Sequence, residues 1–357
     1  MILFSLVLLL PQTDSDASVL SNEGRAAAER GLQWLAAHQL ADGSWTGDVG
    51  YKLQDGYEVW QRNSEHVGVT ALAGMAFLAG GHVPDRGPYG PVVARAADFI
   101  LQHVQDNGYI SFNETRMYSH AFATLFLAEM HGMTARRDVR EALQKAVNLI
   151  VGSQNQEGGW RYQPNVADAD MSVTVCQVVA LRAARNIGIQ VPASTIDRAV
   201  SYVKRSAVRE DEPRSHWTPN PVGSFRYQPT SDSRASFALT AAGIVTLHGA
   251  GVYADEDIER GLEYLESDLR NFSHETGIAA GGHYFFYYGH YYAVQAFHMA
   301  GGRRYRNYFE SVEQTLLRMQ KDDGSWPNNV GPGRAFGTAV ACLILQIPRE
   351  YLPIFQR

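Results

Sequence analysis

Residues Gly158 to Val175 read GGWRYQPNVADADMSVTV, and part of this stretch occurs twice in the chain. The segment WRYQP (160–164) returns sixty-five residues later as FRYQP (225–229). Each copy follows a polar loop and precedes an apolar run of helical period. The stretch is therefore the joint between the two helices of a repeated helix–loop–helix unit, and that unit decides the fold.

The same unit can be marked six times, each as an amphipathic outer helix, a turn and a more apolar inner helix. The outer helices are expected at 24–40, 92–105, 139–154, 195–209, 257–269 and 308–320. The inner helices are expected at 65–79, 116–130, 168–186, 232–248, 284–299 and 334–345. The inner segments are apolar nearly all round, which indicates burial on several sides, and alternating strand patterns are almost absent. We therefore predict an all-α fold, an (α/α)6 toroid of six helical hairpins with inner helices around a central cavity; an open solenoid is the alternative.

Composition and charge narrow the classes of protein. The 357-residue chain has 45% hydrophobic and 19% charged residues, as a globular protein does. Its net charge of −6 and the lack of any Lys/Arg block argue against a nucleic-acid partner. Its two cysteines, Cys176 and Cys342, lie in apolar helical runs of the third and sixth units, so we expect two buried thiols rather than a disulfide or a metal site.

The N-terminus carries an apolar run at residues 2–10, followed by Pro11 and a polar tract that extends to Asn22. The run resembles a short secretory signal and is too short to span a bilayer. We therefore expect residues 1–22 to be a signal peptide with a short linker and residues 23–357 to be a single toroid domain. The protein is expected to be exported, periplasmic or secreted, with a cytoplasmic location as the alternative. No other segment is long and apolar enough to be transmembrane.

Three of the joints share a second pattern, in which a glutamine is followed at fixed spacing by a glycine and a tryptophan. The three are Gln39-x3-Gly43-x-Trp45, Gln154-x3-Gly158-x-Trp160 and Gln320-x3-Gly324-x-Trp326. Glycine can adopt the left-handed conformation that ends a helix, and tryptophan can stack on the start of the next one. The pattern resembles the QW repeats of the terpenoid cyclase and protein prenyltransferase superfamily, which includes the squalene–hopene cyclases. The resemblance covers residues 24–347 and implies an α/α toroid in which these residues are structural.

The same resemblance points to a candidate acid. Squalene-type cyclases carry an Asp-x-Asp-Asp motif at the start of an inner helix, and Asp168-Ala169-Asp170-Met171 matches three of its four positions. The match implies that Asp170 protonates an alkene and that Asp168 orients it, which requires a carboxylic acid held neutral in a dry pocket. The alternative is that both aspartates are helix N-caps, because the helix dipole favours the ionised form.

Basic side chains mark other expected inner-helix starts. Arginines stand at Arg116, Arg234 and Arg334, in alternating units of the ring, and histidines stand at or near two further starts, as His66 and His290. Arginine forks suit phosphate and carboxylate groups, so an anionic ligand head could dock at this mouth of the ring. Equally, the arginines can pair with the aspartates of the motif and hold them ionised.

A stripe of tyrosines runs along one face of the fifth inner helix, at Tyr284, Tyr288, Tyr291 and Tyr292. In the resembling cyclases, aromatic faces line the cavity and stabilise carbocations through the ring quadrupole. Core packing is the ordinary alternative for aromatic residues at helical spacing.

Metal chemistry is not expected. Protein prenyltransferases of the superfamily bind zinc through an Asp-x-Cys pair, but here the position reads Asp170-Met171-Ser172 and lacks the thiolate, so we predict no cofactor. The resemblance implies a squalene-cyclase-like toroid that performs acid-initiated cyclisation or isomerisation of an isoprenoid or another hydrophobic small molecule. The alternative is a non-catalytic toroid that binds a hydrophobic, anionic or glycan ligand or a protein partner. Glycan cleavage is a third hypothesis, from analogy of fold alone.

Overall fold

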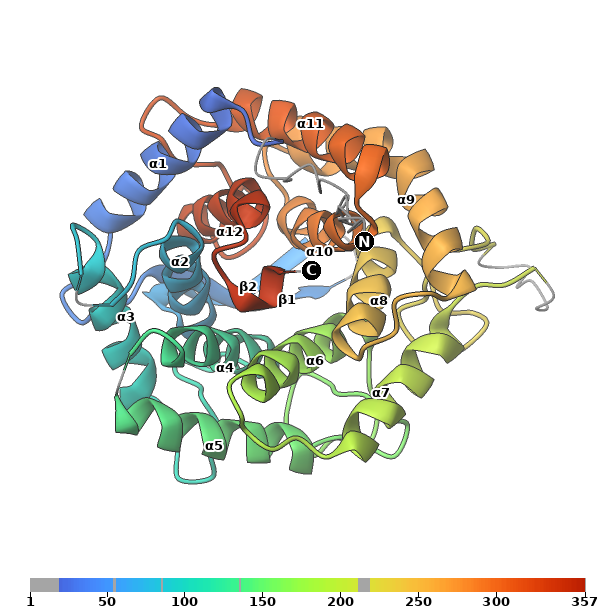
Figure 1. Cartoon of the computed structure of the whole chain (residues 1–357), viewed down its shortest axis with the longest axis horizontal. Helices are drawn as coiled ribbons and strands as arrows, with labels where there is room; N and C mark the ends of the chain where they lie inside the picture. The colour runs from blue at the N-terminus through green and yellow to red at the C-terminus, as the bar shows by residue number, and fades with distance from the viewer. Residues whose placement is uncertain (1–18, 54–55, 85, 135, 211–218, 357) are drawn as a thin grey trace, which may run out of the picture.

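The computed structural model describes residues 19–356 except 54–55, 85, 135 and 211–218, and there the chain forms two concentric rings of α-helices (Figure 1). The outer ring contains α1 (Asn22–Ala37), α3 (Gly90–Gln102), α5 (Arg137–Gly152), α7 (Ala193–Ser206), α9 (Glu256–Ser273) and α11 (Gly302–Met319). The inner ring contains α2 (Val67–Ala79), α4 (Met117–His131), α6 (Met171–Asn186), α8 (Phe237–Gly249), α10 (Tyr284–Ala300) and α12 (Arg334–Gln346). Each inner helix packs on the next, and α12 closes the ring against α2. The predicted (α/α)6 toroid is confirmed, and the open solenoid is wrong.

Burial follows the hydrophobic pattern of each ring. Every residue of α2 is buried, because α4 and α12 cover its sides and outer helices cover its back. The outer helix α7 instead buries one face, in which Thr195, Ala199 and Tyr202 recur at helical spacing. Layers of this kind bury one continuous core without any sheet between them.

The Gln–Gly–Trp turns tie each outer helix to its neighbours. The Gln154 amide nitrogen donates to the carbonyls of Gly158 and Thr195, both at 2.8 Å, and Thr195 lies on the next outer helix. The Trp160 indole donates to the Ile150 carbonyl at 2.7 Å. The turns at residues 39–45 and 320–326 make equivalent bonds. Gly158 has φ +97°, and a Cβ there would lie 2.3 Å from the Arg198 carbonyl oxygen, so only glycine fits.

The prediction missed an antiparallel hairpin between α1 and α2, formed by β1 (Thr46–Leu53) and β2 (Gly56–Glu65). Glycines at positions 47, 50 and 56 interrupt the apolar alternation that would have revealed these strands, and the register shifts near Gly47 and Gly50. The hairpin is tied to the joint before α12, where Asp48 N donates to the Pro332 carbonyl at 2.8 Å.

The chain end forms a second unpredicted feature, which we call the C-terminal plug (residues 347–356). Two short 3-10 turns, η3 (Ile347–Arg349) and η4 (Pro353–Phe355), follow α12 and carry the chain into the centre of the ring (Figure 1). Leu352, Ile354 and Phe355 are buried there. The plug thus covers the end of the inner ring at which the inner helices finish.

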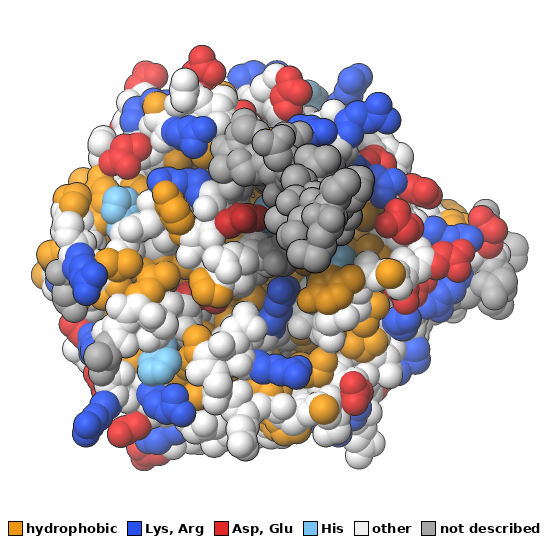
Figure 2. All heavy atoms as spheres, viewed as in Figure 1, with side chains coloured by type: hydrophobic (Ala, Val, Ile, Leu, Met, Phe, Trp, Pro, Cys, Tyr) orange, Lys and Arg blue, Asp and Glu red, His pale blue; other side chains and the backbone are white. Residues whose placement is uncertain are grey.

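Residues 1–18 of the expected leader lie outside the described residues. The residues just after them belong to the fold, because Leu20 is buried and the Ser21 hydroxyl donates to Glu313 on α11 at 2.9 Å. None of the helices in the described ranges has the length and apolar character needed to cross a membrane. On the face drawn in Figure 2, positive and negative side chains are interspersed around the rim.

Candidate functional site

The six inner helices all begin at the end of the inner ring opposite the plug, and we call this end the mouth; the centre of the inner ring is called the hole. Their N-cap residues are His66, Arg116, Asp170, Ser236, His283 and Gly333. The joints interlock here: Met117 N donates to the Tyr162 carbonyl at 3.0 Å, and Met171 N donates to the Tyr227 carbonyl at 2.9 Å. The helices α4 and α6 therefore begin against the next joint along the chain. The positive dipole ends of all six inner helices face the mouth.

Asp170 is fully buried at the start of α6. Its Oδ1 accepts hydrogen bonds from Val173 N at 2.9 Å and from the Ser172 hydroxyl at 2.5 Å. Its Oδ2 faces Arg161 Nη1 at 3.4 Å, and the same guanidinium faces the more exposed Asp168 at 3.4 Å. The N-cap expected as the alternative role is therefore present, but the arginine partner is Arg161 rather than one of the three predicted arginines.

Four tyrosines surround this ion pair, and we call Tyr118, Tyr162, Tyr227 and Tyr288 the tyrosine cluster. The Arg161 guanidinium lies over the rings of Tyr162 and Tyr227, at 4.8 and 5.4 Å from their centroids. The hydroxyls of those two tyrosines bond to each other at 2.6 Å. They hold equivalent places in the two copies of the repeated segment, so ring closure brings the repeat into contact with itself.

The electrostatics of Asp170 are set by opposing effects. Burial raises its pKa, while the hydrogen bonds from Ser172 and Val173 N, followed by the Arg161 charge, lower it; the net direction is upward. Burial, with the nearby Asp170 charge, holds the pKa of Tyr118 well above its usual range. Burial therefore shifts the carboxyl group of Asp170 toward its neutral form and the surrounding phenols toward theirs.

The predicted arginines do not converge on one ligand position. Arg116 reaches the cluster, with its guanidinium 5.9 Å from the Tyr162 ring centroid and 4.7 Å from that of Trp60 on β2. Arg234 is exposed in the loop before α8. Arg334 bonds to Asp323 and lies over the Trp34 ring of α1 at 5.2 Å, so it points toward the outer ring. The three arginines do stand at the starts of alternate inner helices, but the prediction that they bind one anionic group together is corrected, because their side chains diverge.

The predicted histidines have structural partners. His66 caps α2 by accepting from Val69 N at 3.2 Å, and burial lowers its pKa to about 4, which keeps it neutral. His290 faces Ser273 on α9 at 3.0 Å and Tyr308 on α11 at 2.9 Å. Both of its nitrogens therefore face outer helices, and the prediction that His290 binds a ligand in the hole is corrected to core packing.

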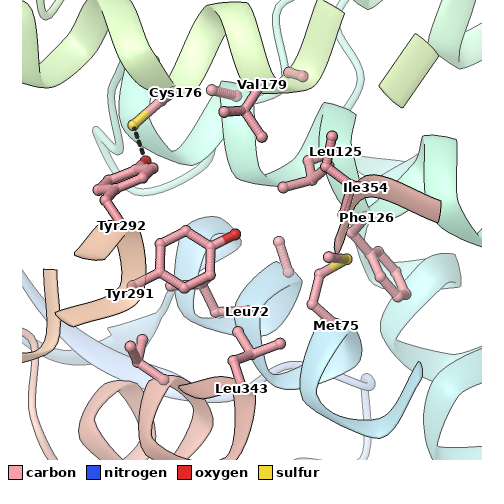
Figure 3. Packing of buried hydrophobic residues seen from close by; sticks show 14 of the residues in the cluster. Leu72, Met75, Leu125, Phe126, Cys176, Val179, Tyr291, Tyr292, Leu343 and Ile354 are labelled. Atoms are coloured by element: carbon pink, nitrogen blue, oxygen red, sulfur yellow. Dashed lines mark hydrogen bonds between the residues drawn. The ribbon is translucent and has the colours of Figure 1, made fainter. Parts of the chain in front are cut away.

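The tyrosines of the α10 stripe lie in two places, some at the mouth and some deeper in the ring. Tyr284 lies beside His283 at the mouth, with ring centroids 4.5 Å apart. Tyr288 donates to the Ser172 carbonyl at 3.1 Å and so joins the tyrosine cluster. Tyr291 and Tyr292 lie deeper, where Figure 3 shows them facing the centre of the ring. The stripe thus runs from the mouth into the hole.

Apolar side chains from several inner helices surround this deeper part, among them Leu72, Met75, Leu125 and Val179 (Figure 3). The Cys176 thiol lies 3.1 Å from the Tyr292 hydroxyl, and burial raises its pKa to about 12. Cys342 is also a buried free thiol, but it faces the outer helix α1. The expectation of two buried thiols is confirmed. Within the described ranges, no three His, Cys, Asp or Glu side chains are grouped as metal ligands would be.

Sequence reasoning found Asp170 and the tyrosine stripe but missed Arg161, Ser172, Tyr118, Tyr162 and Tyr227. One signal was available: Arg161 and Tyr162 stand inside the repeated segment beside the motif. Tyr118 gave no such signal, because it comes from the preceding joint and only the packing of α4 against α6 brings it near.

Comparison with known proteins supports the fold. No protein-family model matches the chain. The squalene–hopene cyclase of Bradyrhizobium diazoefficiens is 30% identical over 104 residues, which is 29% of this chain and 14% of that enzyme. The match therefore covers only a small part of the enzyme's length.

Solved structures extend the likeness to the whole chain. The type II terpene cyclase MstE from Scytonema, in complex with geranylgeranyl dihydroxybenzoate, has a TM-score of 0.57 at 14% identity and covers 93% of this chain and 98% of its own. An alpha-1,6-mannanase of Salegentibacter has a TM-score of 0.58 at 8% identity, covering 90% and 98%. Identities this low establish fold and leave activity open. The comparisons therefore show that the chain has the α/α toroid fold, which type II terpene cyclases and glycan-cleaving enzymes share.

Proposed function

We propose that this toroid is an acid catalyst that isomerises or cyclises an isoprenoid, with Asp170 as the proton donor. The observation that carries the proposal is a fully buried carboxyl group whose pKa is raised by burial, placed among aromatic rings at the mouth. A terpene cyclase of the same fold binds a geranylgeranyl compound, which supports an isoprenoid substrate. The chemistry needs a neutral acid in a dry pocket, and burial favours that form.

The two carboxyl oxygens of Asp170 have different roles in this proposal. Oδ1 accepts two hydrogen bonds, so the transferable proton is on Oδ2. The alkene π pair forms the new C–H bond, the O–H pair stays on the carboxylate, and the neighbouring carbon becomes a cation. The Arg161 guanidinium, 3.4 Å from Oδ2, then stabilises the carboxylate. A C–H bond beside the cation then breaks, its electron pair forms the new double bond, and the proton passes to water. Asp170 Oδ2 takes a proton back from water, which completes the cycle.

Two further groups have proposed roles. Asp168 faces the Arg161 guanidinium at 3.4 Å and so orients it toward Asp170. The rings of Tyr288, Tyr291 and Tyr292 continue from the mouth into the hole and present aromatic faces to a carbocation. The substrate would therefore place its reacting alkene at the mouth and its chain toward the plug.

The alternative is a toroid that binds a ligand without chemistry. The observation that favours it is the Arg161–Asp170 pair, because a guanidinium at 3.4 Å stabilises the ionised form of the carboxyl group. An alpha-1,6-mannanase of the same fold makes a glycan the first ligand to test for this alternative.

The deciding experiment incubates the protein with squalene, geranylgeranyl diphosphate and a geranylgeranylated aromatic acid, and identifies products by mass spectrometry. We expect Asp170→Asn to lower turnover by roughly 10²- to 10⁴-fold, the usual contribution of a general acid. Asp232→Asn is the matched control, because Asp232 is exposed in the equivalent loop of the next unit. Equal product formation by Asp170→Asn and the wild type would remove the acid role. Binding of mannotriose with no conversion of any isoprenoid would favour the binding alternative.

A further inference from the structure

A directed chain of hydrogen bonds ends on Asp170. The Ser172 hydroxyl donates its only hydrogen to Asp170 Oδ1 at 2.5 Å. The Tyr118 hydroxyl lies 2.6 Å from the same Ser172 oxygen. Because Ser172 has no second hydrogen to give, Tyr118 must donate to Ser172. The chain therefore runs from Tyr118 on α4 through Ser172 on α6 to the carboxyl group.

The other inner helices do not repeat this arrangement. Tyr118 and Ser172 each stand two residues after the N-cap of their helix. The same position in the remaining inner helices is occupied by Gly68, Ala238, Phe285 and Ala335. None of those four side chains can donate a hydrogen bond. The two hydroxyls are thus a feature of the one joint that holds the buried acid.

We infer that Tyr118 is a positioning residue that acts through Ser172 to orient and strengthen Asp170 as an acid. The inference rests on the proposed function and deepens it. Donors on Oδ1 stabilise the carboxylate that remains after proton transfer, and Tyr118 polarises the Ser172 hydroxyl so that its bond is stronger. They also hold the carboxyl plane so that Oδ2 stays on the side of Arg161.

Other titratable groups face Asp170, and their effects on its titration must be distinguished from the effect of the Tyr118–Ser172 hydrogen bonds. Arg161 and Asp168 come from its own loop, and Tyr162, Tyr227, Tyr288 and Cys176 come from the surrounding joints and helices. Burial raises the pKa of each of those tyrosines and of the thiol, so they stay neutral while Asp170 titrates. Asp168 is the nearby carboxylate on the same arginine, and an Asp168→Asn background removes its titration.

The test titrates Asp170 in the ligand-free full chain by carbon-13 NMR of labelled aspartate side chains, with Asp170→Asn to assign the signal. Loss of one donor weakens the ionised form, so Tyr118→Phe and Ser172→Ala each raise the pKa of Asp170 by about half a unit to one unit. Ser172→Thr keeps the hydroxyl and the wild-type titration. Tyr264→Phe is the matched control, because it removes a tyrosine hydroxyl that bonds to Asp268 on the same outer helix.

An unchanged Asp170 titration in Tyr118→Phe would overturn the inference, whatever Ser172→Ala does. With a converted isoprenoid, Tyr118→Phe should lower kcat about three- to tenfold, leave KM nearly unchanged and move the alkaline limb of the pH–rate profile upward. If Tyr118→Phe shifts the titration of Asp170 but the protein converts no isoprenoid, the hydrogen-bond chain is supported and the proposed function is refuted. An Asp170-dependent activity that Tyr118→Phe leaves unaltered in rate and pH profile refutes the inference alone.

Discussion

Asp170 and Glu129 are buried carboxyl groups on neighbouring inner helices, at opposite ends of the same hole. Asp170 precedes the first turn of α6 and accepts hydrogen bonds at 2.5 and 2.9 Å beside an arginine. Glu129 lies in the last turns of α4, and its Oε2 accepts only a long 3.5 Å bond from Ile354 N of the plug. Burial raises the pKa of both, that of Glu129 to about 7.

The difference between the two ends follows from helix direction. A helix N-terminus offers unpaired N–H groups and a positive dipole end, which support a carboxylate, whereas a C-terminus opposes one. At the mouth, hydrogen bonds and the helix start therefore support the ionised form of Asp170, while burial opposes that form and raises its pKa. The plugged end makes ionisation of Glu129 costly and is suited to closing the ring with apolar groups.

The largest expected effect comes from opening the plugged end. Phe355 is 3% exposed, and its ring lies against Tyr291 with centroids 6.4 Å apart. We expect Phe355→Ala to lower the free energy of unfolding by about 3–5 kcal/mol, as for other buried phenylalanines, measured by urea denaturation. Phe112→Ala is the comparison at a mouth-side turn, where the side chain is 37% exposed and packs on His103 with ring centroids 4.1 Å apart, so the loss should be only about 1 kcal/mol. Equal losses for the two variants would show that the plug is not part of the core.

The second-largest effect tests the electrostatic contrast between Glu129 at the plugged end and Asp170 at the mouth. The pKa of Glu129 is about 7 in the folded chain against an ordinary 4.5, so the unfolded state releases its proton first as pH rises. The stability that Glu129 contributes below pH 4.5 is therefore lost progressively up to pH 7. Glu129→Gln keeps the shape and should raise the free energy of unfolding by about 3 kcal/mol at pH 8 and leave it unchanged at pH 4.

The matched control for this titration is Glu310→Gln, which alters an exposed glutamate on α11. Its stability difference from the wild type should be small at both pH values. A Glu129→Gln variant whose advantage did not grow between pH 4 and pH 8 would contradict the assigned environment of Glu129.

The mouth was partly predictable from the sequence because it is built from repeats. The apolar inner segments and the recurrent glycines gave the ring and its helix bounds, and Asp170 stood out because the second copy of the joint lacks it. Arg161 does not stand out in the same way, because the other copy has an arginine at the equivalent place, Arg226. The structure separates the two: Arg226 donates to the Ala207 carbonyl at 3.1 Å, whereas Arg161 faces Asp170. The conformation of each loop decides which partner its arginine contacts, and the periodicity of the sequence carries no information about that conformation.

The plugged end was not predictable by the same reasoning. Residues 347–356 read IPREYLPIFQ, which is too short for a helical period and contains two prolines. Their apolar side chains find a partner only in the hole that the other helices create. A feature that depends on tertiary packing, like the hydrogen bond between Tyr118 on α4 and Ser172 on α6, has no local signal.

The smallest expected effect tests whether the turn before α6 keeps the mouth in place. Gln154 donates to the Gly158 and Thr195 carbonyls, and Asp170 N donates to the Trp160 carbonyl at 3.0 Å within the same turn. Gln154→Ala leaves two carbonyls with fewer donors and should cost about 1–2 kcal/mol in urea denaturation. Gln144→Ala on α5 removes a surface bond to Asn148 and should cost only about 0.2–0.5 kcal/mol. If the two variants were equally stable, the turn would not hold the start of α6, and the placement of Asp170 would have to come from Arg161 and the tyrosine cluster.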